Sequence, residues 1–169
     1  ISDFDYELPE ELIAQQPLSE RDASRMLIVD RASESWRDSR FTELPDNLTA
    51  KDVLVLNNTR VFPARLRGRR APSGGAVELL LLREIETNTW EALARPARRL
   101  RLASEIEFEN TSLRAQIVES RENSVRIIKF RSEEPLETVI DQIGEPPLPP
   151  YIKREFGKSP DDQSRYQTI

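Results

Sequence analysis

The sequence predicts a mixed α+β protein in which an α/β framework is interrupted by a small all-β domain. Residues 1–65 combine short helical signals with apolar strand signals, and residues 133–169 return to helical and proline-rich sequence. Between them, residues 66–132 hold short strand candidates separated by Gly, Asn or Ser, at the spacing of a sandwich or a barrel. We therefore expect an inserted β domain at 66–132, with 1–65 and 133–169 contributing to one α/β domain.

The first segment carries signals for two short helices and three strands. Pro with two following glutamates marks one helix start, and an unbroken apolar run bounded by polar residues is typical of a buried strand. The expected elements are helices at 9–14 and 41–48, a strand at 25–30 with Trp36 on its hairpin partner, and a buried strand at 52–56.

The second segment is read from alternation of apolar and polar residues. Alternation is cleanest at 105–109 and 113–117, which predicts strands with one wet face. The expected strands are residues 77–83, 89–95, 105–109, 113–119 and 125–130. A connecting helix at 135–143, closed by Gly144, is expected to follow.

Two features close the chain. The proline-rich run 145–151 must be extended, because each Pro fixes its own φ and disfavours helix before it. It is either a rigid crossing between domains or a ligand for an SH3-like partner. Ser159, Pro160 and Asp161 then predict a helix start, with no terminating signal before Ile169, so we expect the natural protein to continue.

Composition excludes several kinds of chemistry within these 169 residues. There is no His and no Cys, so imidazole or thiolate catalysis and the usual zinc sites are excluded. Acid or base chemistry in this chain must use a carboxylate, Tyr or Lys. We expect no metal site and no bound cofactor. With no signal-peptide pattern and no apolar run of membrane-spanning length, we expect a cytoplasmic protein.

The net charge of −5 conceals an uneven distribution. Residues 1–50 contain five Arg and twelve Asp or Glu, whereas residues 60–101 contain ten Arg and four Glu. Arg suits bidentate contact with phosphate, so the second region could face a polyanion. The alternative is a set of solvated strand faces. The clustered arginines are Arg60, Arg65, Arg67, Arg69, Arg70, Arg95, Arg98, Arg99 and Arg101.

Polar side chains follow the predicted strand at 52–56. Asn57, Asn58, Thr59 and Arg60 stand where the apolar run stops, and ligands of open α/β sheets bind at the carboxyl ends of strands. These groups can hold a polar, partly anionic ligand. The alternatives are a strand-ending turn for the first three and surface ion pairing for Arg60 and Arg65.

Several blocks follow one another across essentially the whole chain. They are residues 3–9, 13–15 with Pro17, Arg21 with Ser24 and Arg25, 57–66, Gly74 and Gly75 with 77–78, Trp90, 95–96, Gly144, 147–152 with Arg154, and 165–168. In this order they resemble the queuosine-pathway S-adenosylmethionine:tRNA ribosyltransferase-isomerase family. The family usually has Asp where Asn58 stands, and its members are about twice as long.

The resemblance implies an α/β domain carrying an inserted β-barrel, and an activity. The ribosyl part of S-adenosylmethionine would be transferred to 7-aminomethyl-7-deazaguanine at the tRNA wobble position and isomerised, giving epoxyqueuosine and releasing adenine and methionine. S-adenosylmethionine is then a co-substrate, tRNA the partner, and the protein a monomer. A non-enzymatic RNA-binding barrel is the alternative.

We group the candidate residues by role. The expected catalytic set would hold the nucleoside or move protons, the substrate-binding set would line the cleft, and the tRNA-binding set would contact the RNA backbone. Packing is the alternative for the tyrosines, and a helix-face charge the alternative for Arg165. The catalytic candidates are Asn57, Asn58, Thr59, Arg60 and Tyr6; the substrate-binding candidates are Arg65, Tyr151, Arg154, Arg165 and Tyr166; the tRNA-binding candidates are Arg67, Arg69, Arg70, Arg98, Arg99 and Arg101.

Overall fold

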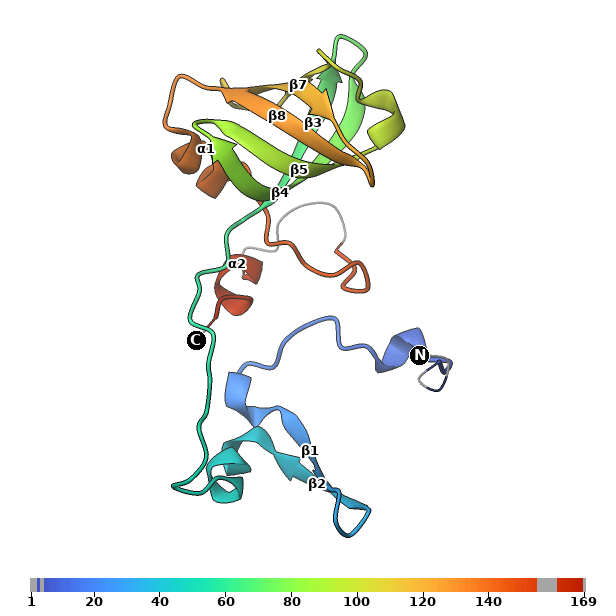
Figure 1. Cartoon of the computed structure of the whole chain (residues 1–169), viewed down its shortest axis with the longest axis vertical. Helices are drawn as coiled ribbons and strands as arrows, with labels where there is room; N and C mark the ends of the chain where they lie inside the picture. The colour runs from blue at the N-terminus through green and yellow to red at the C-terminus, as the bar shows by residue number, and fades with distance from the viewer. Residues whose placement is uncertain (1–2, 4, 155–160, 169) are drawn as a thin grey trace. The chain divides into compact units, whose positions relative to one another are not determined.

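The computed structural model describes residue 3, residues 5–154 and residues 161–168 (Figure 1). By their internal contacts the residues form two units. One comprises Ile1–Asn58, Pro150–Lys153 and Ile169, and the other comprises Thr59–Pro149 and Arg154–Thr168. In chain order the elements are the 3-10 helices η2 (Glu10–Leu12) and η3 (Arg21–Ala23), β1 (Arg25–Asp30), β2 (Ser35–Arg40), η4 (Phe41–Asn47), β3 (Arg65–Ala71), β4 (Gly75–Glu86), β5 (Thr89–Arg95), η5 (Ala97–Arg99), β6 (Glu105–Glu107), β7 (Arg114–Ser120), β8 (Val125–Arg131), α1 (Leu136–Ile143) and α2 (Asp162–Arg165).

The first unit is built around the hairpin of β1 and β2. The strands pair antiparallel from Arg25 opposite Arg40 to Asp30 opposite Ser35, which confirms the predicted hairpin. The two predicted helices form only as the 3-10 helices η2 and η4. In η4, Pro45 removes one backbone donor, which is incompatible with a regular α-helical ladder. The Gln15 side chain donates to Tyr151 O (3.0 Å) and accepts from Lys153 N (2.7 Å), fixing the segment 150–153 within this unit.

The prediction of a buried strand at 52–56 is wrong. The segment has no assigned helix or strand (Figure 1), and Val53 and Val55 are 87% and 86% exposed. Apolar residues on both faces suit a strand that is covered on both sides. Within the described residues no neighbouring strand supplies the hydrogen-bonding partners that such a strand needs.

The second unit contains a closed barrel of six strands in the order β3-β4-β5-β8-β7-β6 (Figure 1). Every neighbouring pair is antiparallel, and β6 closes the barrel by pairing with β3 from Arg69 opposite Glu107 to Ala71 opposite Glu105. The predicted antiparallel barrel is therefore confirmed. The described strand pairs do not supply the parallel sheet of an α/β framework.

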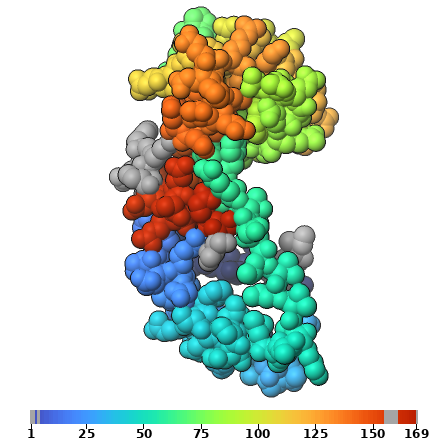
Figure 2. All heavy atoms as spheres, turned by 90° about the vertical axis from the view of Figure 1, so that its left-hand side faces the viewer, coloured from blue at the N-terminus to red at the C-terminus, as the bar shows by residue number. Residues whose placement is uncertain are grey.

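The barrel core follows the alternation of its strands. Inward side chains are almost fully buried, beneath the surface that the space-filling view shows (Figure 2). A register shift between Ile117 and Glu119 lets consecutive residues of β8 be buried. The largest fully buried side chains of this unit are Leu66, Leu79, Leu100, Ile106, Leu113, Ile117, Ile128, Val139 and Ile140.

Strand β3 was not predicted, because its sequence is dominated by Arg. Its arginines at 67 and 69 point outward, while Leu66 is fully buried and Gly68 faces the interior. A Cβ on Gly68 would lie 2.8 Å from Ile106 Cγ2 and 2.7 Å from Glu107 O, so only Gly fits between β3 and β6 here. The sequence signal for this strand therefore lies in its inward residues Leu66 and Gly68.

Helix α1 closes onto the barrel core, in agreement with the helix predicted at 135–143. Leu136, Val139 and Ile140 occupy one face at helical spacing and are buried. After the helix, Glu145 forms an isolated bridge with Arg65, and Leu148 is 8% exposed. The start of the proline-rich run is thus packed against the barrel, which disfavours its use as a free SH3 ligand.

Two further predictions meet the limits of the described residues. The helix start at Ser159 and Pro160 lies outside them, although α2 follows at Asp162. Among the described helices, none has the length and apolar character needed to cross a membrane.

Candidate functional site

The polar cluster at 57–60 lies in an extended, exposed segment. The boundary between the two units falls between Asn58 and Thr59. All four side chains are exposed, and the segment before them is not a strand, so the prediction that they follow a buried strand is wrong; that they bind a ligand stays a prediction. Arg60 Nη2 lies 3.9 Å from Asp141 Oδ2, and both side chains are solvated (73% and 49% exposed). Such a solvated pair stabilises the protein by about 0–1 kcal/mol.

Residues near the C-terminus fix the backbone that follows this cluster. The Gln167 side chain accepts from Val61 N (2.9 Å) and donates to Val61 O (3.0 Å), as a neighbouring strand would. Thr168 Oγ1 donates to Thr59 O at 2.6 Å. These contacts hold residues 59–61 and 167–168 together within the second unit. Sequence reasoning quoted Gln167 and Thr168 as part of a motif but gave them no role.

Arg154 is held by a carboxylate that the sequence did not pair with it. Its Nε and Nη2 donate to Asp162 Oδ2 (2.8 Å) and Oδ1 (2.9 Å), and Nη2 also donates to the Tyr166 hydroxyl at 3.3 Å. Asp162 is 5% exposed. The hydrogen bonds that Arg154 donates to Asp162 raise the pKa of Arg154 further above its usual value, against the opposing effect of burial. Two of the predicted substrate-binding residues, Arg154 and Tyr166, are thus joined around Asp162.

The other substrate-binding candidates lie in different surroundings. Arg65 is half-buried, donates from Nη2 to Leu148 O (2.9 Å), and lies 3.9 Å from Glu78 Oε1. Arg165 is half-buried at the end of α2. In the first unit, Tyr6 and Tyr151 are 73% and 56% exposed, which argues against packing as their role.

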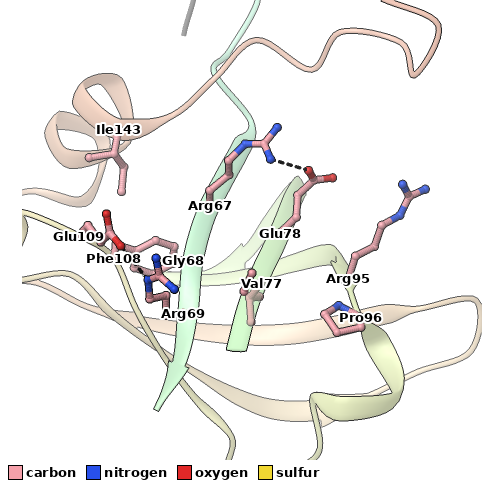
Figure 3. A pocket seen from close by; sticks show the side chains of 11 residues that line it. Arg67, Gly68, Arg69, Val77, Glu78, Arg95, Pro96, Phe108, Glu109 and Ile143 are labelled. Atoms are coloured by element: carbon pink, nitrogen blue, oxygen red, sulfur yellow. Dashed lines mark hydrogen bonds and ion pairs between the residues drawn. The ribbon is translucent and has the colours of Figure 1, made fainter. Parts of the chain in front are cut away.

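Two of the predicted tRNA-binding arginines are already paired with carboxylates. Arg67 Nε donates to both oxygens of Glu145 (3.1 Å each), and its Nη1 lies 3.7 Å from Glu78 Oε2. Arg69 Nε donates to Glu109 Oε1 at 2.7 Å. Figure 3 shows Arg67 beside Glu78 and Arg69 beside Glu109. A phosphate would have to compete with these carboxylates for either guanidinium.

Four arginines around η5 differ from those of β3. Arg95, Arg98, Arg99 and Arg101 are exposed, and none forms an ion pair with another described residue. In Figure 3 the Arg95 side chain extends away from the sheet toward solvent. We call these four residues the η5 arginine surface. Arg70, the remaining tRNA-binding candidate, is half-buried and donates to Ser73 Oγ (2.9 Å) and Arg99 O (2.8 Å).

A groove of about 840 Å³ crosses the outside of the barrel between these two groups of arginines. Its lining includes apolar residues such as Val77, Pro96 and Phe108, with Arg69 and Arg95 among its charged residues (Figure 3). Glu78 and Glu109 also line the groove and pair with Arg67 and Arg69, so its charged edge is mixed, and its apolar floor suits a ligand with ring character. Within the described part of the chain, no group of three or more potential ligands converges on a point that could hold a metal ion.

Comparison with known proteins identifies the family. The profile of the queuosine biosynthesis protein family matches residues 1–169. The chain belongs to this family. It is also similar to a solved structure, that of S-adenosylmethionine tRNA ribosyltransferase from Thermotoga maritima, with 36% sequence identity and a TM-score of 0.42. The match covers 84% of this chain and 48% of that one, so the chain spans about half the length of that protein.

Membership of the queuosine biosynthesis family confirms the resemblance inferred from the ordered sequence blocks. Several neighbours of the candidate residues were nevertheless missed. Asp162 was read only as a helix-start residue, and the alignment of Gln167 with Val61 has no local sequence signal. The sequence also did not single out Arg126, which is buried and donates to Ala97 O and Leu100 O. A single Arg within an apolar strand is usually an outward-facing residue.

Proposed function

We propose that this chain is part of an S-adenosylmethionine:tRNA ribosyltransferase-isomerase. In this reaction the ribosyl moiety of S-adenosylmethionine is transferred to 7-aminomethyl-7-deazaguanine at the tRNA wobble position and isomerised to epoxyqueuosine, and adenine and methionine leave. The observation that carries the proposal is the family match over residues 1–169. The solved relative that is 36% identical is described as an S-adenosylmethionine tRNA ribosyltransferase, which is consistent with it.

The chemistry requires orientation, proton transfer and stabilisation of leaving groups. The sulfonium acidifies the protons on the adjacent ribose carbon, and the aminomethyl nitrogen of the tRNA base attacks the ribose. In our proposal Asn57, Asn58 and Thr59 hydrogen-bond the nucleoside or methionyl part, and Arg60 binds a carboxylate or phosphate. Tyr6 contributes stacking or proton transfer, since the chain has no His.

The substrate-binding candidates take two kinds of role in this proposal. Tyr151 and Arg165 contact the substrate directly. Arg65, Arg154 and Tyr166 act mainly by position, since Leu148 O and Asp162 already accept hydrogen bonds from the two guanidiniums. The hydrogen bonds of Gln167 and Thr168 to residues 59–61 would keep Arg60 in place.

We also propose that the first unit belongs to an α/β domain completed by further polypeptide of the family. Leu27, Val29 and Trp36 on one face of the hairpin are 59%, 61% and 75% exposed, and residues 53–56 are exposed as well. Apolar surface of this extent is typical of an interface. In this proposal residues 66–132 are the inserted domain, and residues 1–65 and 133–169 contribute to the framework. The whole protein is a cytoplasmic monomer without a resident cofactor.

The decisive test is release of free adenine. The full-length protein is incubated with S-adenosylmethionine and a tRNA carrying the 7-deazaguanine precursor, and adenine is measured by chromatography. We expect one adenine per modified tRNA, and none with a tRNA that lacks the precursor base. Binding of tRNA without adenine release would instead support a non-enzymatic RNA-binding module.

The site assignment is tested separately with Arg60→Ala in the same full-length protein. Loss of a charge-assisted contact of about 1.5–3 kcal/mol predicts a decrease in kcat/KM of roughly 10- to 100-fold. Arg37→Ala is the matched control, because Arg37 is also exposed and weakly paired, with its Nη1 4.0 Å from Glu43 Oε2. Wild-type activity in the Arg60 variant would remove this residue from the site.

A further inference from the structure

The turn formed by η5 is held from beneath by two guanidinium groups. Arg126 donates from Nη2 to Ala97 O (2.7 Å) and from Nε to Leu100 O (3.0 Å). Arg70 donates from Nη1 to Arg99 O (2.8 Å). The Leu100 side chain is 1% exposed and belongs to the barrel core. The backbone under the η5 arginine surface is therefore fixed by hydrogen bonds and by burial.

Arg126 is an unusual buried cation. It is 9% exposed, and its remaining donors reach Arg121 O (3.2 Å) and Val125 O (2.7 Å). Carbonyl oxygens satisfy its N–H groups, but no carboxylate among the described residues neutralises its charge. A buried charge without a counterion is costly, and an anion bound nearby reduces that cost.

The charges around η5 add to this field. The exposed guanidiniums of Arg95, Arg98, Arg99 and Arg101 have no carboxylate partner among the described residues. Several other arginines of the barrel are paired with carboxylates, as in Arg83 with Glu91 (2.6 Å) and Arg114 with Glu107 (3.4 Å). The four exposed guanidiniums around η5, which pair with no described carboxylate, therefore contrast with the paired Arg67 and Arg69 of β3.

We propose that the η5 arginine surface binds the phosphodiester backbone of the RNA substrate, with Arg126 as a positioning residue beneath it. The proposal rests on the proposed function and makes it more specific, since it separates η5 from Arg67 and Arg69. The guanidiniums are exposed and distributed along a turn, so they suit successive phosphates better than one small anion. Contacts of this kind position RNA without reading its sequence.

The test measures binding of a fluorescent tRNA transcript to the full-length protein by anisotropy over a series of salt concentrations. In the triple variant Arg98→Ala/Arg99→Ala/Arg101→Ala, loss of three phosphate contacts should reduce the slope of log K against log salt by about 2 to 3. The same contacts predict an affinity loss of roughly 50- to 200-fold at about 0.15 M salt. The matched control Arg37→Ala/Arg83→Ala/Arg114→Ala removes the same charge from paired positions and should change affinity less than about 3-fold.

Equal losses in the two triple variants would overturn the proposal, because net charge alone would then explain binding. If the wild type releases adenine and the η5 variant binds tRNA normally, this inference fails and the proposed function stands. If the η5 variant loses tRNA binding but the wild type releases no adenine, the surface stands and the proposed reaction fails.

The positioning role of Arg126 is tested with Arg126→Lys, which keeps the charge but cannot reach four carbonyls from one planar group. We expect KM for tRNA to rise at least about 5-fold, with kcat at saturating tRNA and KM for S-adenosylmethionine unchanged. A uniform loss of active protein would leave both KM values unchanged and lower kcat. That result, or an unaltered KM for tRNA, would contradict the positioning role.

Discussion

Replacing Gly144 by Ala should destabilise the barrel unit strongly, although its backbone angles suit any residue. Gly144 has φ −67° and ψ 150°, so Ala introduces no backbone strain. An added Cβ would lie 2.3 Å from Pro63 O, 2.6 Å from Ile140 O and 3.0 Å from Pro63 Cβ. Two of these atoms are backbone oxygens that cannot rotate away. The end of α1 must then separate from Pro63, and we expect the free energy of unfolding to fall by about 3 kcal/mol, the upper end of the usual overpacking cost.

Gly75→Ala provides the matched control for this experiment. Its added Cβ would have Ser73 Oγ as nearest neighbour at 3.8 Å, which is ordinary contact. We expect a change within about 0.5 kcal/mol. Unfolding in urea is followed by the fluorescence of Trp90, whose ring stacks on that of Phe62 with the ring centroids 5.6 Å apart. A Trp36→Phe background leaves Trp90 as the one Trp of these 169 residues. Equal destabilisation by the two substitutions would refute the steric reasoning.

Two further predictions concern the C-terminal contacts. Asp162→Asn removes the carboxylate that accepts hydrogen bonds from Arg154. The free energy of local unfolding of α2 should fall by about 3 kcal/mol, so amide hydrogen exchange in this helix should accelerate. Exchange unchanged from wild type would show that the ion pair does not stabilise this helix. Gln167→Leu removes both hydrogen bonds to Val61, so a loss of about 1–2 kcal/mol should make the Val61 amide exchange about 5- to 30-fold faster. An equally protected amide would mean that another group replaces Gln167.

The barrel could be predicted from the sequence because its strands bury one face. The expected strand at 89–95 coincides with β5, that at 113–119 is shifted by one residue from β7, and that at 125–130 ends one residue before β8 does. Strand β3 was missed because outward arginines hide a pattern that only Leu66 and Gly68 reveal. Long-range closure of β3 on β6 has no local signal, since the pairing depends on residues about 35 positions apart.

The candidate site residues stay a prediction, and the structure differs from the sequence-based expectation in their surroundings. The prediction of a buried strand from the apolar run at 53–56 was wrong, because a strand forms only where a neighbouring strand supplies hydrogen-bonding partners, and none does so among the described residues. Pairing of Arg154 with Asp162, and of Gln167 with Val61, depends on tertiary structure. In the sequence, the arginines of η5 and of β3 belong to one basic region. Only the structure distinguishes them, because Glu78, Glu109 and Glu145 form ion pairs with the arginines of β3.

The most direct measurement of the central claim follows the ribose carbons. Full-length protein is incubated with precursor tRNA and S-adenosylmethionine labelled with carbon-13 in its ribose, and the tRNA is digested for mass spectrometry. The account predicts that the modified wobble nucleoside carries all of the labelled ribose carbons, with adenine released in equal amount. A methylated tRNA that lacks the ribose label, or tRNA that binds the protein and remains unlabelled, would contradict it.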